Sequence, residues 1–251
     1  MNFFIKIIKF FVLPVLHFIR RILTIIKKHC LPNYTPEPPR LFKTSYEFYV
    51  REEEEKSYEH FKKFFKSSIF LDTERIRKYA LLKALSNDKN ENNYYFEFGV
   101  FKGLSINYLS QFLKTNIYGF DSFEGLKEDW KGSILESGYF DLKGKTPKVN
   151  KNVKLVKGLV QDTLVDFLSK IKNSKINFVH IDLDTYESTK FVLENIKPYL
   201  TKNAILLFDE LYNFSGWDQG EYKALCDVFN ENEYKFLAFS KSSCQAVIQI
   251  V

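Results

Sequence analysis

Acidic residues follow two strand-like runs of the sequence, and their spacing indicates metal-assisted chemistry. The two groups are Asp182 with Asp184, after the apolar run at 176–179, and Asp209 with Glu210, after the run at 204–208. Because burying an unpaired charge is costly, carboxylates beside apolar strands need a partner. If the two strands are neighbours in a parallel sheet, the four acids gather at its carboxyl edge, where open α/β sheets bind ligands. Such oxygen ligands suit a hard divalent cation such as magnesium.

The spacing within each acidic group suggests separate roles. Asp182 and Asp184 are two residues apart, so their side chains point to the same side of an extended strand. One of them can bind a metal while the other takes a proton from a substrate hydroxyl. Asp209 and Glu210 would complete the metal site. His180 is a second candidate for proton transfer, although a histidine within a strand is more often a satisfied core residue.

A second candidate site lies in the strand–turn–helix unit that begins at Glu97. Gly99 lets the backbone approach a ligand, and the N-terminus of the following helix favours an anionic group. The glycine spacing is not G-x-G-x-x-G, so a dinucleotide fingerprint is not supported. Asp121 lies 22 residues after Gly99 at the end of the next predicted strand. An acid there accepts hydrogen bonds from ribose hydroxyls, and the alternative is a turn cap.

The elements that would position these residues alternate between strands and helices. Strands are predicted at 94–98, 117–120, 153–156, 176–181, 204–208, 234–239 and 245–251. Helices are predicted at 44–66, 73–85, 104–113, 163–171, 187–196 and 221–229. The alternation predicts an α/β fold with a doubly wound, mostly parallel, seven-stranded sheet. The short connection between the last two strands allows an antiparallel hairpin at the sheet edge.

The N-terminal 30 residues differ in charge from the rest of the chain. They hold six of the 37 Lys and Arg residues and no acid, so the remainder is neutral, with 31 basic and 31 acidic residues. A neutral main domain predicts no nucleic-acid partner. Residues 2–28 place basic and polar side chains opposite an apolar face, which favours a helix lying on an anionic membrane surface. Docking on the protein's own core or on a second subunit is the alternative.

Four segments are expected: a basic amphipathic helix at 1–30, a proline-rich linker at 31–40, a helical cap or lid at 41–90 and the main domain at 91–251. Cys30, Cys226 and Cys244 are odd in number and widely spaced, which favours a reducing compartment. We therefore expect a cytoplasmic protein that is peripheral on the inner membrane face. The sequence does not determine the oligomeric state, and a homo-oligomer is compatible with it.

Four motifs occur in an order that resembles a known enzyme family. They are Glu97-Phe98-Gly99-Val100 with Gly103, the run from Gly119 to Leu126, the run from His180 to Tyr186, and Phe208-Asp209-Glu210 with Gly216-Trp217. These motifs resemble the macrocin O-methyltransferase family over about residues 70–251. Its members are Rossmann-like class I S-adenosylmethionine-dependent enzymes that methylate sugar hydroxyls of natural products and use magnesium.

The resemblance implies roles for individual residues. S-adenosylmethionine would be held by Glu97, Gly99, Gly103 and Asp121, with Ser122 and Asp162 as further candidates. Magnesium would be bound by Asp182, Asp209 and Glu210, and Asp184 would be the general base. Family members often carry Asp at the position of Glu210. The metal would lower the pKa of a substrate hydroxyl, whose oxyanion would then attack the methyl sulfonium in line.

Two other interpretations remain open at this stage. In the first, Asp182 and Asp184 hold a metal–diphosphate in a glycosyltransferase, although the Gly99 turn and the Asp121 spacing favour a ribose-bearing cofactor. In the second, the protein is a non-catalytic, membrane-attached scaffold, which the intact acidic groups argue against. For the methyltransferase, the N-terminal helix leads us to expect a lipid-linked or envelope glycan as acceptor.

Overall fold

The structure, a computed structural model, describes residue 15 and residues 18–19, 44–88, 93–171 and 175–251. Contacts divide the chain into two units, Met1–Thr44 and Ser45–Val251, and every element described below belongs to the second. The amphipathic helix predicted at 1–30 lies outside the described residues except at Val15, Phe18 and Ile19, and so does the linker predicted at 31–40. No helix among the described residues is long and apolar enough to cross a membrane.

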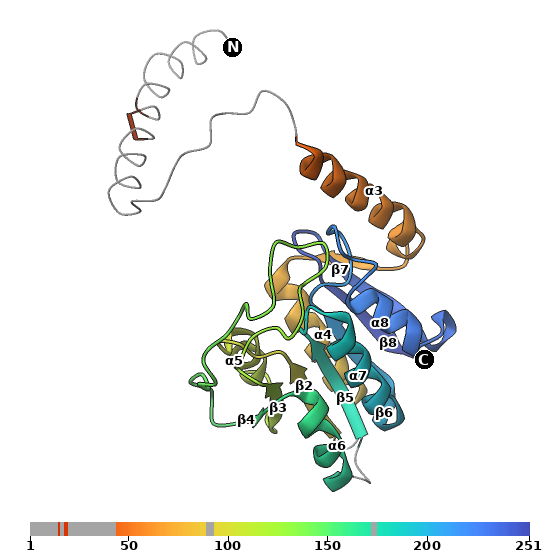
Figure 1. Cartoon of the computed structure of the whole chain (residues 1–251). Helices are drawn as coiled ribbons and strands as arrows, with labels where there is room; N and C mark the ends of the chain where they lie inside the picture. The colour runs from red at the N-terminus through yellow and green to blue at the C-terminus, as the bar shows by residue number, and fades with distance from the viewer. Residues whose placement is uncertain (1–14, 16–17, 20–43, 89–92, 172–174) are drawn as a thin grey trace. The chain divides into compact units, whose positions relative to one another are not determined.

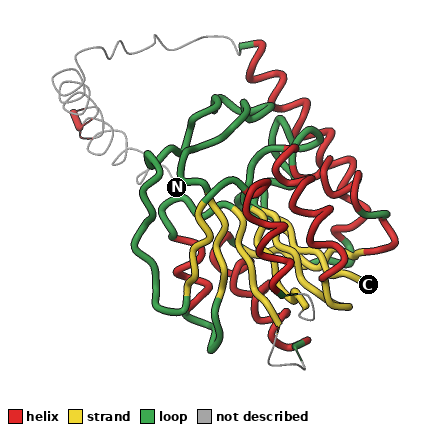
Figure 2. Tube along the Cα trace, turned by 60° about the horizontal axis from the view of Figure 1, so that its bottom comes forward, coloured by secondary structure: helices red, strands yellow, loops and turns green. Residues whose placement is uncertain are grey.

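One mixed sheet runs through the second unit in the strand order β1-β7-β8-β6-β5-β2-β3-β4 (Figure 2). The strands are β1 Ile69–Leu71, β2 Asn93–Phe98, β3 Ile117–Asp121, β4 Val153–Lys157, β5 Lys175–Ile181, β6 Leu200–Phe208, β7 Tyr234–Ser240 and β8 Ala246–Ile250. Neighbouring strands are parallel except β8, which is antiparallel to both β6 and β7. The predicted doubly wound, mostly parallel sheet and its closing antiparallel hairpin are therefore present.

The predicted strand number needs a correction, because the sheet has eight strands and not seven. The additional strand, β1, has three residues and pairs with β7 outside the hairpin. Three residues are too few to display a periodic apolar pattern, so a strand of this length leaves no signal in the sequence.

Helices cover both faces of the sheet (Figure 1). They are α3 Ser45–Phe65, α4 Thr73–Asn87, α5 Leu104–Ser110, α6 Val160–Lys170, α7 Tyr186–Ile196 and α8 Glu221–Val228, with 3-10 turns at Lys197–Tyr199 and Glu231–Glu233. Side chains of α3, α6, α7 and α8 belong to one apolar cluster, and those of α4 and α5 belong to the other. The sheet separates the two clusters, as expected for a strand order wound in both directions.

Strand β6 shows how the sequence builds both layers. Leu206 and Phe208 join the α6–α7–α8 cluster, while Ile205 and Leu207 join the α4–α5 cluster. Successive side chains of a strand point to opposite faces, so a continuous apolar run is needed where both faces are covered. The chain winds from β2 outward to β4 and then crosses to β5 on the other side of β2. Ligands bind open α/β sheets at such a switch point, beyond the carboxyl ends of the strands.

Candidate active site

A cavity of about 320 Å³ lies at the carboxyl ends of the central strands β2, β3, β5 and β6. Predicted site residues on its wall are Gly99, Asp121, Ser122, Asp182, Asp184, Asp209 and Glu210. Residues separated by more than 100 positions in the sequence are thus brought to one cavity. Glu97, Gly103, Asp162 and His180 do not line it.

The turn after β2 has room only for glycine at position 99. Gly99 has φ +86°, and a Cβ atom there would lie 1.7 Å from the backbone oxygen of Asp182. The Asp182 amide donates a hydrogen bond to Phe98 O at 2.8 Å, which joins the ends of β2 and β5. Gly99 therefore allows the turn after β2 and the acidic end of β5 to pack directly against each other.

Asp121 holds that turn through its carboxylate. Its Oδ2 accepts the amides of Val100 at 2.8 Å and Phe101 at 2.7 Å, and its Oδ1 accepts the amide of Phe123 at 2.6 Å. A carboxylate offers about four acceptor positions, so three amides leave capacity for one further donor. Asp121 lies on the cavity wall, where that donor can be a ligand hydroxyl.

The other predicted cofactor residues, Glu97, Gly103 and Asp162, do not line the cavity. Glu97 is fully buried, accepts a hydrogen bond from Ser105 Oγ at 2.8 Å and lies 2.9 Å from His180 Nδ1. Gly103 caps the N-terminus of α5, and Asp162 lies in the first turn of α6. Direct contacts of these three residues with S-adenosylmethionine stay predictions.

The acids at the ends of β5 and β6 form one cluster. The Asp209 amide donates to Ile181 O at 2.9 Å, which sets the two acidic strand ends side by side. Asp182, Asp184 and Glu210 can offer oxygens that all lie within 4.8 Å of one another, and Asp182 also belongs to a group with His180 and Asp209. Asp182 is therefore the centre of the cluster.

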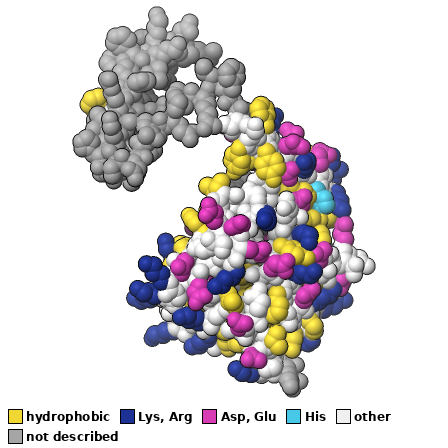
Figure 3. Space-filling model, viewed as in Figure 1, with side chains coloured by type: hydrophobic (Ala, Val, Ile, Leu, Met, Phe, Trp, Pro, Cys, Tyr) yellow, Lys and Arg dark blue, Asp and Glu magenta, His cyan; other side chains and the backbone are white. Residues whose placement is uncertain are grey.

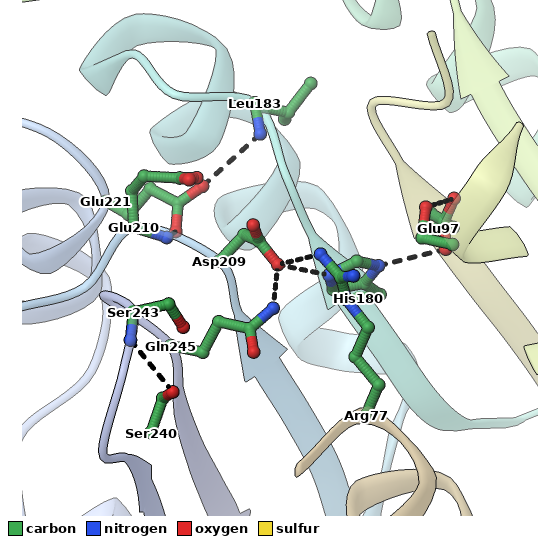
Figure 4. Close-up of polar contacts among 11 residues, drawn as sticks. Arg77, Glu97, His180, Leu183, Asp209, Glu210, Glu221, Ser240, Ser243 and Gln245 are labelled. Carbon is green, nitrogen blue, oxygen red and sulfur yellow. Dashed lines mark hydrogen bonds and ion pairs between the residues drawn. The ribbon is translucent and has the colours of Figure 1, made fainter. Parts of the chain in front are cut away.

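Three donors converge on one oxygen of Asp209, as Figure 4 shows. Oδ1 accepts from Arg77 Nη2 at 2.8 Å, from His180 Nε2 at 3.2 Å and from Gln245 Nε2. Burial alone would raise the pKa of Asp209, but the hydrogen bond from His180 and the charges of His180 and Arg77 outweigh it and lower the pKa below its usual range. Asp209 is thus held ionised, and its second oxygen points away from these donors.

His180 is fully buried between Glu97 and Asp209. Burial disfavours its charged form, yet hydrogen bonds to Asp209 and Glu97 raise its pKa to about 10. The protonated ring then donates from both nitrogens, and His180 does not line the cavity. This geometry makes His180 a support for Asp209 behind the site.

Electrostatic repulsion within the cluster makes it a suitable site for a cation. Burial, followed by the charge of Asp209, raises the pKa of Asp182 and of Glu210 well above the usual values. The same two causes raise the pKa of Asp184 to about 7. Glu210 Oε2 is buried and has no hydrogen-bond partner among the described residues. A crowded group of carboxylates with one buried, unpartnered oxygen fits a divalent cation, which would relieve the repulsion between the charges.

Glu221 is a site residue that sequence reasoning missed. It is fully buried at the start of α8, and its carboxylate accepts the amides of Leu183 at 3.3 Å and Glu210 at 3.1 Å (Figure 4). Burial, followed by the charge of Asp184, raises its pKa to about 8. Glu221 therefore ties the two acidic strand ends together. An acid in the first turn of a helix is ordinary, so its sequence position gave no signal.

Two loops near the cavity are fixed to each other. Gly132 approaches Gly216 so closely that a Cβ atom on Gly132 would lie 2.3 Å from the Gly216 backbone, and Ser215 Oγ donates to Gly132 O. Tyr49 of α3 donates to Ser215 O at 2.9 Å. Trp217, from the second loop, does not line the cavity and packs against Phe61 and other aromatic rings of the core.

Comparisons with known proteins agree with this fold. The profile of a family described as a methyltransferase domain matches residues 96–211. The crystal structure of CalS11, a calicheamicin methyltransferase, aligns with a TM-score of 0.58 and 25% identity over 70% of this chain and 77% of that chain. The apo structure of CalS11, described as a TDP-rhamnose 3'-O-methyltransferase, aligns with a TM-score of 0.53, also at 25% identity, over the same shares of both chains. No curated protein matches the sequence.

The fold and the matched domain define a class I methyltransferase with a Rossmann-like sheet. The chain is an S-adenosylmethionine-dependent methyltransferase, so the glycosyltransferase and scaffold interpretations are set aside.

Proposed function

We propose that this enzyme transfers a methyl group to a hydroxyl of a sugar or glycan, with magnesium, as a member of the macrocin O-methyltransferase family. The observation that carries the proposal is the position of the acidic cluster. Asp182, Asp184 and Glu210 offer oxygens within 4.8 Å of one another on the wall of the cavity that also contains Asp121. The similarity to CalS11, described as a TDP-rhamnose 3'-O-methyltransferase, supports a sugar acceptor.

Asp182, Asp209 and Glu210 would hold the metal. Three donors occupy Asp209 Oδ1, so its other oxygen is the one available for a cation. When bound, magnesium supplies a Lewis acid that lowers the pKa of an acceptor hydroxyl. Arg77, His180 and Gln245 keep Asp209 ionised and oriented.

Asp184 would take the proton from the acceptor hydroxyl. It lies on the cavity wall and is 7% exposed, and burial raises its pKa to about 7, which suits a base that works near neutral pH. Its φ of 63° is uncommon for a residue other than glycine, and such conformations often occur at functional sites. S-adenosylmethionine, when bound, would supply the methyl group to the deprotonated hydroxyl oxygen, with the C–S bond breaking as the C–O bond forms, and would leave as S-adenosylhomocysteine.

The cofactor would bind at the turn after β2. Asp121 would accept a hydrogen bond from a ribose hydroxyl through its remaining acceptor capacity, and Gly99 allows close approach of the backbone. Ser122 lies beside Asp121 on the same wall. Glu97, Gly103 and Asp162 are further proposed cofactor residues from the family resemblance.

Calorimetric titration of the full chain with S-adenosylmethionine is the first test, followed by methyl transfer to TDP-rhamnose and other sugars with magnesium or with EDTA. We expect Asp184→Asn to keep cofactor affinity and to lose on the order of 100-fold or more in kcat. Asp141→Asn, at an exposed acid outside the cavity wall, is the matched control. Transfer that is unaffected by EDTA and by Asp184→Asn would refute the metal-assisted mechanism.

We infer a cytoplasmic location, peripheral on the inner membrane face, with a lipid-linked or envelope glycan as acceptor. The charge pattern of residues 2–28 and the cysteine usage support this inference. Partitioning of the full chain and of a chain lacking residues 1–30 to anionic liposomes tests it, and equal partitioning would refute a membrane role for that segment. Light scattering would determine whether the protein is a homo-oligomer.

A further inference from the structure

A basic segment lies between two stretches of the chain that line the cavity. Residues 142–161 contain six lysines and no acid. These lysines, here called the lysine strip, are Lys143, Lys145, Lys148, Lys151, Lys154 and Lys157. All six are exposed, and within the described ranges none of them forms an ion pair. The strip is therefore an uncompensated positive surface.

The charge count of the whole chain conceals this surface. Of the 37 Lys and Arg residues, six lie in residues 1–30 and six in the strip, which leaves 25 against all 31 acids. The apparently neutral main domain is thus a strongly basic strip joined to an acidic remainder. Figure 3 shows Lys and Arg side chains gathered along the left margin of the view, on the side where Figure 1 draws β4 and the connection before it.

The strip begins at the cavity and follows the sheet edge. Lys157 ends β4, directly before Gly158 of the cavity wall. Its Nζ donates to Gly144 O at 2.6 Å, which places the Lys143–Lys145 turn beside it. The remaining lysines lie on or just before β4, the outermost strand on this side of the sheet. Lysines at an edge strand also prevent unwanted pairing, but only Lys154 and Lys157 lie on the strand itself.

Apolar side chains stand exposed beside the lysines. Leu104 is 80% exposed, and it follows Gly103, where a Cβ atom would contact Val149 and Pro147 of the basic segment. Tyr139 is 52% exposed and precedes the basic segment in the chain. Lysines that lie close to exposed aliphatic and aromatic side chains are typical of surfaces that lie in the headgroup region of a membrane.

We propose that the lysine strip, with Leu104 and Tyr139, binds an anionic membrane surface and holds the cavity mouth close to it. Charge complementarity with acidic headgroups supplies the attraction. The strip contains no arginine, which is the residue best suited to bidentate contacts with phosphate in nucleic-acid recognition. Its exposed apolar neighbours, Leu104 and Tyr139, would have no role in contacts to a phosphate backbone. Those two features favour a lipid surface over a nucleic acid. This contact lies outside residues 1–30 and does not depend on the methyl-transfer reaction.

Vesicle flotation of the full chain tests the proposal. The vesicles are phosphatidylcholine with phosphatidylglycerol at a 3:1 ratio, compared with phosphatidylcholine alone. A variant that combines Lys148→Gln, Lys151→Gln and Lys154→Gln, none of which lines the cavity, is expected to bind the anionic vesicles on the order of 10- to 100-fold more weakly. Leu104→Gln is expected to weaken vesicle binding without changing its dependence on salt.

The matched control carries the same change of charge away from the strip: Lys62→Gln, Lys202→Gln and Lys235→Gln, all at exposed positions. We expect this control to bind anionic vesicles almost as the wild type does. Unchanged vesicle binding by the strip variant, or an equal loss in the control, would overturn the proposal. The proposal would also be overturned if the strip variant lost binding to a double-stranded RNA oligonucleotide but kept its binding to anionic vesicles. The strip would then bind a nucleic acid and not a membrane. Calorimetry with S-adenosylmethionine verifies that each variant is folded.

Discussion

His180 Nε2 lies 3.2 Å from Asp209 Oδ1, and of the two residues Asp209 lines the cavity whereas the fully buried His180 does not. Because His180 also contacts Glu97, His180→Leu would leave the buried carboxylate of Glu97 and the partly buried carboxylate of Asp209 without their shared cation. We expect this variant to lose about 3–5 kcal/mol of unfolding free energy, measured by urea denaturation at pH 7. The control is His60→Leu, a half-buried histidine whose ring contacts Tyr222. If both variants lost the same amount of unfolding free energy, the ion pairs of His180 with Glu97 and Asp209 would not be the cause of the destabilisation.

Glu221→Gln should weaken metal binding. The glutamine oxygen can accept the amide of Leu183 or that of Glu210, but its NH₂ group then faces the other donor. Residues that orient metal ligands typically contribute 10- to 100-fold to affinity, and we expect a loss of about that size for Mn²⁺ in calorimetry. Glu59→Gln, on the exposed face of α3, is the control. Wild-type Mn²⁺ affinity in a folded Glu221→Gln protein would contradict this positioning role.

Without metal, the protein should become less stable as the pH rises. Burial raises the pKa of Asp184 to about 7 and of Glu221 to about 8, so each folded carboxyl binds its proton more tightly than the unfolded one. Their stabilising contribution is present below about pH 4 and is lost as the pH rises through 7 and 8. His180, with its pKa raised to about 10, changes in the same direction between about pH 6.5 and 10.

The measurement is the melting temperature between pH 5.5 and 8.5, in EDTA and in magnesium chloride. We expect a decrease of about 5 °C or more across this range in EDTA. Magnesium should flatten the profile because a cation favours the ionised carboxylates. Asp184→Asn should reduce the slope in EDTA, and a flat profile for the metal-free wild type would disprove the expectation.

Gly99 and Gly138 form a matched pair for testing close packing at the turn. Their φ angles are +86° and +85°, but a Cβ atom on Gly138 would have nothing within 4 Å, whereas one on Gly99 would overlap Asp182 O. Gly138→Ala should therefore cost only about 1–2 kcal/mol of conformational strain. Gly99→Ala should cost more and abolish S-adenosylmethionine binding. Chemical denaturation measures the loss of unfolding free energy, and calorimetry measures the affinity for S-adenosylmethionine. Equal losses in the two variants would mean that the positive φ angle, and not the close contact with Asp182, determines the cost.

The central sheet and most of the cavity wall follow from local sequence patterns. Apolar runs continuous enough for a doubly covered sheet predict β5 and β6, and the acids that follow each run must then lie at one edge. Asp182 and Asp209 lie close to each other as soon as β5 and β6 pair. The start of α6 at Val160, three residues before the predicted start, is an ordinary error at a helix boundary.

The contacts around Asp209 could not be predicted in the same way. Arg77 is 132 positions away in the sequence, in a helix whose pattern shows only core packing, and Gln245 is 36 positions away, in the turn before β8. Their convergence depends on how α4 and the turn before β8 are placed on the sheet. The lysine strip was missed for a different reason, because a net charge averages over regions of opposite sign.

The contact of Gln245 with Asp209 limits how far this enzyme can be truncated at its C-terminal end. The matched family profile ends at residue 211, yet the side chains that orient Asp209 and Glu210 come from Gln245 and Glu221 beyond that point. A recombinant fragment that stops at the profile boundary would keep every predicted metal ligand and lose two of the residues that position them. The catalytic unit is therefore larger than its recognisable sequence signature, and chimaeras with related enzymes should exchange the closing hairpin together with the acidic strand ends.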